Sequence, residues 1–219
     1  MELNNQKQEF KEKIMKYSSL EILDSTDLDI YPCGIGGRIW KSAVMLSNVL
    51  SNESLKNFVN FEDKVVLEIG AGCGIGGLIA SNLKSRKVYL TDNDPGCIEV
   101  MKHNYEVNKE RLNLGQVEVF GFDWVNREEY AKFSDKIDII IGSDIIYALF
   151  MVDGLIRALD SLCEVGMTFL LAYHKRGPET ETFLEKIEAT KKWKIENVSQ
   201  YVVDDEFLRN GVSVLVKIA

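Results

Sequence analysis

Apolar and polar positions along the chain follow two periods in turn. Short apolar runs have the length of strands, and the stretches between them place apolar residues at helical spacing. The predicted strands lie at residues 65–67, 88–90, 117–120, 137–141 and 167–173, with helices at 40–50, 76–83, 95–108 and 152–163. Strands joined by helices of this length need right-handed crossovers, so the pattern predicts an α/β fold with a mainly parallel sheet covered on both faces.

The carboxyl-terminal part departs from this alternation. Residues 193–203 and 211–218 are two strand-like runs, and only the acidic turn 204–206 and a short connection separate them. Because no helical crossover of full length lies between these runs, we expect them to pair antiparallel.

The amino-terminal part departs as well. Residues 1–17 suit a loosely amphipathic helix or a partly disordered arm, and the alternation over 20–31 predicts a small hairpin before a glycine cluster. We therefore divide the chain into an arm and hairpin, residues 1–35, and one α/β domain, residues 36–219.

Composition and charge narrow the class of protein. The chain has 219 residues, 46% of them hydrophobic, which is enough for one sizeable core. Its formal net charge of -8 repels a polyphosphate backbone, so we expect no nucleic-acid partner. The apolar runs are strand-sized and the first residues are polar, so we expect neither a membrane nor export. The four cysteines form no CxxC pair and the two histidines lack metal-ligand spacing, so we expect that the protein binds no metal. We also expect the thiols to be reduced, in a cytoplasmic protein that could also enter the nucleus.

A glycine-rich segment follows the strand at 65–67. Gly70, Gly72 and Gly74 alternate there, which lets a ligand approach the backbone closely. Glu68 lies near the carboxyl end of the same buried strand, where an unpaired ion would cost several kcal/mol. The ammonium and sulfonium charges of S-adenosylmethionine would match this carboxylate, whereas a pyrophosphate would be repelled. A glycine turn that binds nothing is the alternative.

A dinucleotide-binding loop must also be weighed, because Gly72, Gly74 and Gly77 satisfy GxGxxG. In that fold, however, the first glycine ends the strand. Counting from Gly70, which ends the strand here, the third required glycine position holds Ile75. The register therefore argues against a dinucleotide.

Acidic and aromatic residues end the next two strands. Asp92 can accept both ribose hydroxyls, whereas Asp94 precedes Pro95 and is expected to cap a helix. Asp123 offers a carboxylate to the adenine amino group, and the indole of Trp124 could cover the ring. Ordinary core packing is the alternative for Trp124.

With these residues in place, the chain resembles the seven-β-strand S-adenosylmethionine methyltransferases, and more narrowly the family 16 group of protein-lysine methyltransferases. The resemblance covers residues 37–176. Four motifs carry it in order, namely Gly37-Arg38-Ile39-Trp40, Glu68-Ile69-Gly70-Ala71-Gly72-Cys73-Gly74, Asp123-Trp124 and Ser143-Asp144-Ile145-Ile146-Tyr147. The glycine loop alone would indicate only the superfamily, whereas the last motif together with the Trp40 segment indicates the narrower group.

The resemblance implies a Rossmann-like three-layer sandwich, with a mainly parallel seven-stranded sheet of order 3-2-1-4-5-7-6 and an antiparallel last strand. It makes residues 36–219 a methyltransferase domain that acts as a monomer on a protein substrate, such as a chaperone or translation factor. S-adenosylmethionine is the implied cofactor, and the candidate cofactor-binding residues are Trp40, Glu68, Gly70, Gly72, Asp92, Asp123, Trp124 and Ser143.

The predicted function is therefore transfer of a methyl group to a lysine ε-amine, with Asp144 and Tyr147 as catalytic candidates at the lysine entrance. Presenting that amine neutral at pH 7 costs about 4.6 kcal/mol, because free lysine titrates near ~10.4. An aromatic channel of Tyr147, Phe150 and Trp40 would lower this cost, and Asp144 would orient the amine. A helix cap is the alternative for Asp144, and a packed aromatic for Tyr147. The alternative functions are a small-molecule methyltransferase and a non-catalytic S-adenosylmethionine-binding subunit.

Overall fold

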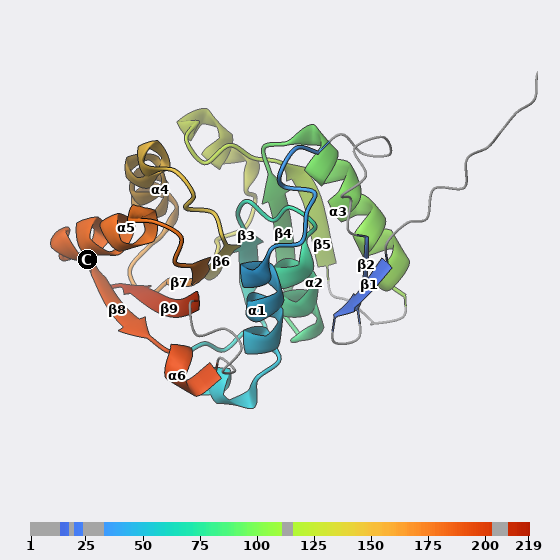
Figure 1. Ribbon diagram of the computed structural model, residues 1–219, viewed down its shortest axis with the longest axis horizontal. Coiled ribbons are helices and arrows are strands. Elements are labelled where there is room, and N and C mark those ends of the chain that lie inside the picture. The colour runs from blue at the N-terminus through green and yellow to red at the C-terminus, as the bar shows by residue number, and fades with distance from the viewer. Residues whose placement is uncertain (1–13, 18–19, 24–32, 111–115, 203–209) are drawn as a thin grey trace, which may run out of the picture.

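The computed structural model describes residues 14–17, 20–23, 33–110, 116–202 and 210–219, and forms a sheet with helices on both faces (Figure 1). The sheet contains β3 (Val65–Glu68), β4 (Lys87–Asp92), β5 (Gln116–Gly121), β6 (Ile139–Ser143), β7 (Thr168–His174), β8 (Trp193–Asn197) and β9 (Asn210–Lys217). The helices are α1 (Lys41–Leu50), α2 (Ile75–Asn82), α3 (Pro95–Asn108), α4 (Leu149–Leu162), α5 (Glu179–Ala189) and α6 (Ser199–Val202), with 3₁₀ turns η1 (Glu53–Asn57) and η2 (Arg127–Lys132). None of the described helices is both long and apolar enough to cross a bilayer.

The strand order is β5-β4-β3-β6-β7-β9-β8, which is the predicted order 3-2-1-4-5-7-6. Neighbours from β5 to β7 run parallel, and β9 runs antiparallel to both β7 and β8. The predicted fold class is thus confirmed. The carboxyl ends of β3, β4 and β6 meet at one edge of the sheet, which is where ligands bind in open sheets of this kind.

The core consists of two apolar layers, one on each face of the sheet. Val66 and Leu90 point into the layer under α1, α2 and α3, whereas Leu67 and Tyr89 point into the layer under α4 and α5. Both faces are covered, so the strands read as continuous apolar runs instead of alternating ones. Figure 1 shows these two sets of helices on opposite sides of the strands.

The end of the chain differs from the predicted strand over 193–203. β8 stops at Asn197, and residues 199–202 form the short helix α6. The side chain of Asn197 accepts a hydrogen bond from the Ser199 amide at 3.0 Å, which favours a helical turn over a continued strand. The antiparallel pairing with β9 is confirmed over the shorter strand.

The predicted hairpin over 20–31 is described only in its first strand. β2 (Leu20–Leu23) pairs antiparallel with β1 (Ile14–Tyr17), which falls in the segment expected to be helical or disordered; residues 24–32 lie outside the described chain. Two buried asparagines of α3 bind the β2 backbone, because Asn108 Oδ1 accepts from Glu21 N at 2.9 Å and Asn104 Oδ1 accepts from Leu23 N at 2.8 Å. The hairpin is therefore fixed to the domain through α3.

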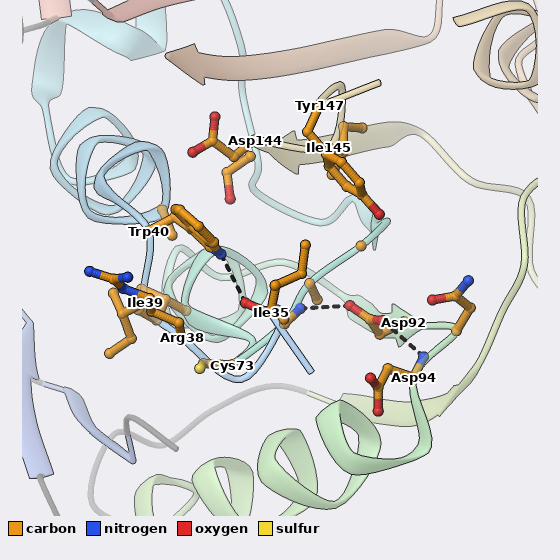
Figure 2. Close-up of a pocket in the computed structure, with 18 of the residues that line it drawn as sticks. Ile35, Arg38, Ile39, Trp40, Cys73, Asp92, Asp94, Asp144, Ile145 and Tyr147 are labelled. Carbon is orange, nitrogen blue, oxygen red and sulfur yellow. Dashed lines mark hydrogen bonds between the residues drawn. The ribbon is translucent and has the colours of Figure 1, made fainter. Parts of the chain in front are cut away.

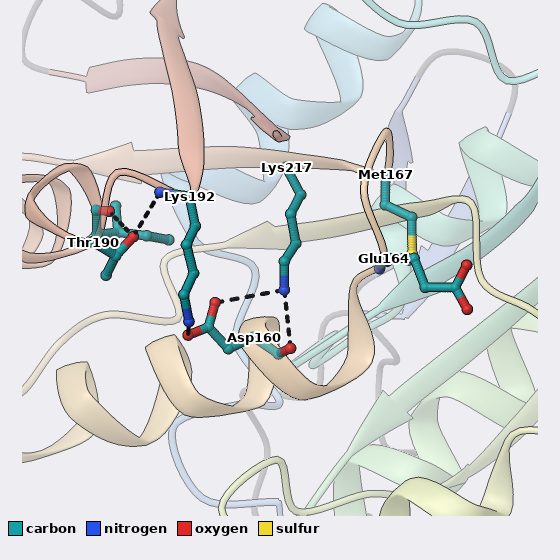
Figure 3. Close-up of polar contacts among 7 residues, drawn as sticks. Asp160, Glu164, Met167, Thr190, Lys192 and Lys217 are labelled. Carbon is teal, nitrogen blue, oxygen red and sulfur yellow. Dashed lines mark hydrogen bonds and ion pairs between the residues drawn. The ribbon is translucent and has the colours of Figure 1, made fainter. Parts of the chain in front are cut away.

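An ionic contact attaches the last strand to α4 (Figure 3). The ammonium of Lys192 lies 2.8 Å from Asp160 Oδ2, and that of Lys217 donates to the Asp160 carbonyl at 3.0 Å. Lys217 is largely buried, so its charge is held in a fixed position rather than in solvent. This contact joins α4, the start of β8 and the end of β9 far from the edge where the predicted site residues gather.

Candidate active site

A pocket of about 230 Å³ opens at the carboxyl ends of β3, β4 and β6 (Figure 2). Its wall includes every predicted site residue except Glu68 and Asp123. Asp92 and Asp144, which come from different strand ends, lie at different ends of this pocket in Figure 2. The topology thus brings together residues that are widely separated in sequence.

The glycine loop contributes backbone and small side chains to the pocket wall. Gly70 and Gly72 have φ values of 58° and 55°, a region that other residues rarely adopt. A Cβ on Gly70 would lie 2.8 Å from the Ile145 side chain and 3.3 Å from the Trp124 ring, and one on Gly72 would lie 2.6 Å from the Gly36 carbonyl oxygen. Both glycines are therefore required, by conformation and by space, for this close approach.

Asp92 anchors the loop from the end of β4. Its Oδ2 accepts from Gly72 N at 2.9 Å and its Oδ1 accepts from Asp94 N at 3.0 Å (Figure 2). Each oxygen has two acceptor positions, so the carboxylate keeps acceptor capacity for a ligand. Burial raises the pKa of Asp92, although these backbone bonds oppose the rise. Asp94 itself accepts from Gly96 N at 2.7 Å and caps α3, as predicted, while also lying on the pocket wall.

Trp124 and Asp123 are placed differently from each other. Trp124 is both a core residue and a pocket residue, because it is 8% exposed and also forms part of the wall. Its Nε1 has no hydrogen-bond partner within the described chain. Asp123 lies off the wall, where its Oδ1 accepts from Val125 N at 2.9 Å and holds a turn.

Glu68 lies behind the glycine loop and contacts the start of α2. It is 1% exposed, and its Oε2 accepts from Gly77 N at 2.7 Å in the first helical turn. The residue before this helix, Gly74, has no side chain to cap it, so Glu68 supplies the acceptor from the neighbouring strand. Burial, with a smaller contribution from the charge of Asp92, raises the pKa of Glu68 to about 8. The sequence led us to expect that a ligand donates hydrogen bonds to Glu68, but the donor in the structure is an amide of α2.

This raised pKa predicts how Glu68→Gln changes stability with pH. The folded-state pKa of about 8 exceeds the ordinary value of 4.5, so the stability contributed by protonated Glu68 is complete below 4.5 and is lost as pH rises through about 8. Glutamine keeps the bond to Gly77 and does not ionise. We expect the variant to gain at least about 3–6 °C in Tm over the wild type at pH 9, which corresponds to about 1.5 kcal/mol at about 2–4 °C per kcal/mol in a domain of this size.

Thermal melts of both proteins between pH 5 and pH 9 measure this difference. The gain should vanish near pH 5, and the exposed change Glu99→Gln on α3 should give no such trend. A difference in Tm between the two proteins that stays constant from pH 5 to pH 9 would show that Glu68 does not titrate in this range.

Asp144 occupies a constrained position directly after β6. Its φ is 55°, its Oδ1 accepts from His174 N at 3.2 Å, and its Oδ2 lies 2.5 Å from the guanidinium of Arg176. The helix that follows is capped at Ala148 without a side-chain bond, so the alternative of Asp144 as a helix cap is wrong. Tyr147 is 53% exposed on the wall, which excludes the packed-aromatic alternative.

The predicted aromatic channel is incomplete. Trp40 and Tyr147 line the pocket, but Phe150 is 86% exposed and lies off the wall. Trp40 is instead covered by cations, since the guanidinium carbons of Arg38 and Arg176 lie 5.4 Å and 4.7 Å from its ring centroid. Its Nε1 donates to the Ile35 carbonyl at 3.1 Å.

Sequence reasoning did not assign Arg176 a role, although it lines the pocket. The available signal was its position two residues after β7, because that strand also ends at the edge where the pocket opens. Ser143, at the end of β6, lines the pocket as predicted.

Comparisons with known proteins agree with this geometry. The chain is 30% identical over 175 residues to the protein-lysine N-methyltransferase EFM3 of Chaetomium thermophilum, covering 75% of this chain and 50% of that protein. It is 29% identical over 184 residues to EEF1A lysine methyltransferase 3 of Xenopus tropicalis, covering 84% of this chain and 70% of that one. The chain spans about half the length of some curated relatives, 46% and 50% in two of them.

Solved structures share the fold at lower identity. Magnesium protoporphyrin IX methyltransferase from Synechocystis, crystallised with bound S-adenosylmethionine, superposes with a TM-score of 0.57 at 16% identity, covering 80% of this chain and 79% of that one. Residues 19–190, most of the chain, match the family described as lysine methyltransferase. The chain therefore belongs to the lysine methyltransferase family, as the order of its motifs indicates.

Proposed function

We propose that this protein transfers a methyl group from S-adenosylmethionine to a lysine ε-amine of another protein. One observation carries the proposal: a single pocket is lined by the glycine loop and Asp92 and also by Asp144 and Tyr147. The names of the relatives, which describe protein-lysine methylation, support it.

The residues present fit S-adenosylmethionine. Gly70 and Gly72 line the pocket with backbone that the amino-acid end of the cofactor can approach, and Asp92 keeps acceptor capacity for the ribose. Trp124 offers a flat ring on the wall and an indole donor without a partner in the described chain. Glu68 supports the cofactor loop from behind through α2, and Asp123 holds the turn that carries Trp124. When bound, the cofactor supplies a methyl group on a sulfonium that is already activated toward an amine.

The chain's own residues then have two tasks, to align the amine and to keep it unprotonated. Asp144 has an acceptor for one amine hydrogen, which fixes the nitrogen lone pair relative to the pocket. Tyr147 and Trp40 line the opening, and the two guanidinium groups that already lie over Trp40 disfavour a further cation there. The pocket opens directly to solvent at the exposed Tyr147, which favours a side chain from a protein surface over an enclosed small molecule.

Incubation of the pure protein with methyl-labelled cofactor and a cell lysate tests the proposal. We expect one labelled protein band and, after digestion, label on a lysine. Label confined to small molecules would support a small-molecule methyltransferase instead. Absence of label in protein that still binds the cofactor would support a non-catalytic binding subunit.

We also propose that the enzyme is a monomer of the cytoplasm and nucleus that acts on a chaperone or translation factor and contacts neither nucleic acid nor membrane. The net charge of -8 supports the exclusion of nucleic acid, and one relative is named for a translation factor. Mass spectrometry of the labelled band would identify the substrate, and a ribosomal RNA or lipid product would contradict this proposal.

A further inference from the structure

The carboxylate expected to receive the substrate amine already has a cationic partner. Asp144 and Arg176 form an ion pair at 2.5 Å, with the aspartate side chain 8% exposed and the arginine 41% exposed. The two residues follow neighbouring parallel strands, because β6 and β7 pair Ser143 with Ala172 near their carboxyl ends. The sheet thus places the backbones of the two residues side by side.

Beyond the ion pair, one further contact fixes each member. The Asp144 carboxylate also accepts from the His174 amide at 3.2 Å, so its orientation is set from β7. The Arg176 guanidinium lies over Trp40 at 4.7 Å, a distance suited to a cation–π contact. Displacing Arg176 would therefore break an ion pair and a ring contact together.

The pairing changes which form of an amine the site favours. An unpaired carboxylate attracts an ammonium and stabilises its proton, which opposes methyl transfer because the protonated nitrogen has no free lone pair. Arginine stays charged at all working pH values and therefore neutralises Asp144 permanently. A neutralised carboxylate can still accept a hydrogen bond from a neutral amine.

We propose that Arg176 is a positioning residue that acts through Asp144, making the pocket select the uncharged lysine amine over the ammonium. The proposal rests on the proposed function. It goes beyond that function by assigning the choice of protonation state to a residue outside the Asp144-x-x-Tyr147 motif.

The remaining charged and titratable groups around the pocket are consistent with this role. Arg38 covers Trp40 as a second cation. Asp92 and Asp94 line the pocket from the end of β4, where backbone amides bind both of them. His174 faces Asp144 through its backbone amide.

A lysine side-chain mimic tests the preference without a protein substrate. Binding of n-butylamine, with S-adenosylhomocysteine present, is followed by ligand-observed NMR from pH 7 to pH 9. Because the neutral fraction of such an amine grows about tenfold per pH unit below its pKa, we expect wild-type affinity to rise about tenfold per unit. Arg176→Gln should bind the ammonium, with affinity that changes less than about threefold across the range.

The neighbouring cation Lys175 provides a matched control. Lys175→Gln removes the same charge from the same exposed segment and should keep the wild-type pH dependence. The proposal would be overturned by any of three results. These are a wild-type affinity that does not change with pH, no detectable binding to the wild type at pH 9, and an Arg176→Gln protein that keeps the tenfold rise per pH unit.

Methyl transfer to the substrate labelled in the lysate gives a second readout. We expect Arg176→Gln to lower kcat/KM about 10- to 100-fold at pH 7, with the deficit shrinking to about threefold near pH 9.5, as removal of an adjacent cation raises the amine pKa by about one to two units. Arg176→Lys should recover part of the loss. S-adenosylhomocysteine affinity should stay within about threefold of the wild type, because no cofactor contact is assigned to Arg176.

The two proposals can fail separately. If the wild type labels no protein but butylamine binds as expected, the proposed function fails and the amine preference stands. If protein is labelled but the Arg176→Gln deficit is equal at every pH, Arg176 has only a structural role and the inference fails.

Discussion

Replacing Asp144 with asparagine is expected to lower methyl transfer by at least about a hundredfold, the usual scale for loss of a positioned proton-acceptor group. The reason is local. Asparagine presents one acceptor instead of two, and its amide group would face either the Arg176 guanidinium or the His174 amide, both of which are donors. The amine would then lose its fixed acceptor, while the cofactor end of the pocket keeps its bonds.

The choice of asparagine matters because the φ of Asp144 is 55°. Asparagine tolerates this left-handed conformation, whereas alanine would add backbone strain to the loss of the carboxylate. Single-turnover methylation and calorimetry with S-adenosylmethionine measure the two effects, and cofactor affinity should change less than about tenfold. The change Asp153→Asn on α4, which removes an exposed carboxylate outside the pocket, should alter neither. Parallel loss of both quantities in folded Asp144→Asn would place Asp144 in the cofactor site.

The part of the fold that the sequence predicts is the part governed by continuous apolar runs. Strands β3, β4, β6 and β7 are buried on both faces, so their apolar runs are nearly continuous, and α3 begins at Pro95 after the cap Asp94. Helix α5 lacked such a signal, because its wholly buried apolar residues are Phe183 and Ile187 in an acidic segment. The hairpin pairing also escaped prediction, since the partners of β2 include asparagine side chains of α3, which no period in the sequence reveals.

The candidate site divides along similar lines. Parallel strands bring their carboxyl ends to one edge, so residues such as Asp92 and Asp144 could be assigned to one site from their positions after strands. Side-chain contacts between strand ends are not encoded in spacing, and this is why the pairing of Arg176 with Asp144 was not anticipated. For Glu68, the sequence showed a buried acid but not the amide of Gly77 that satisfies it. The hydrogen-bond partner of a buried acidic side chain can therefore be a backbone amide as readily as a cofactor.

Asp92→Asn is expected to weaken S-adenosylmethionine binding by about 10- to 150-fold, since a hydrogen bond to a charged group contributes about 1.5–3 kcal/mol. The carboxylate is 8% exposed and already accepts from the Gly72 and Asp94 amides. An asparagine amide group would face one of these two donors, so the variant loses acceptor capacity for the ribose and also loosens the glycine loop.

Calorimetry with S-adenosylmethionine and with its demethylated product gives the affinity, and a thermal melt separates loss of binding from loss of folding. Glu99→Gln, an exposed acid on α3 outside the pocket, is the matched control and should bind normally. A second, weaker signature distinguishes the ribose contact from a purely structural role. Burial raises the pKa of Asp92, so wild-type affinity should fall as pH is lowered toward that pKa, and the variant should lose this dependence. Unchanged affinity in folded Asp92→Asn would mean that the sugar is held elsewhere, and the orientation assigned to the cofactor, with its amino-acid end on the glycine loop, would have to be abandoned.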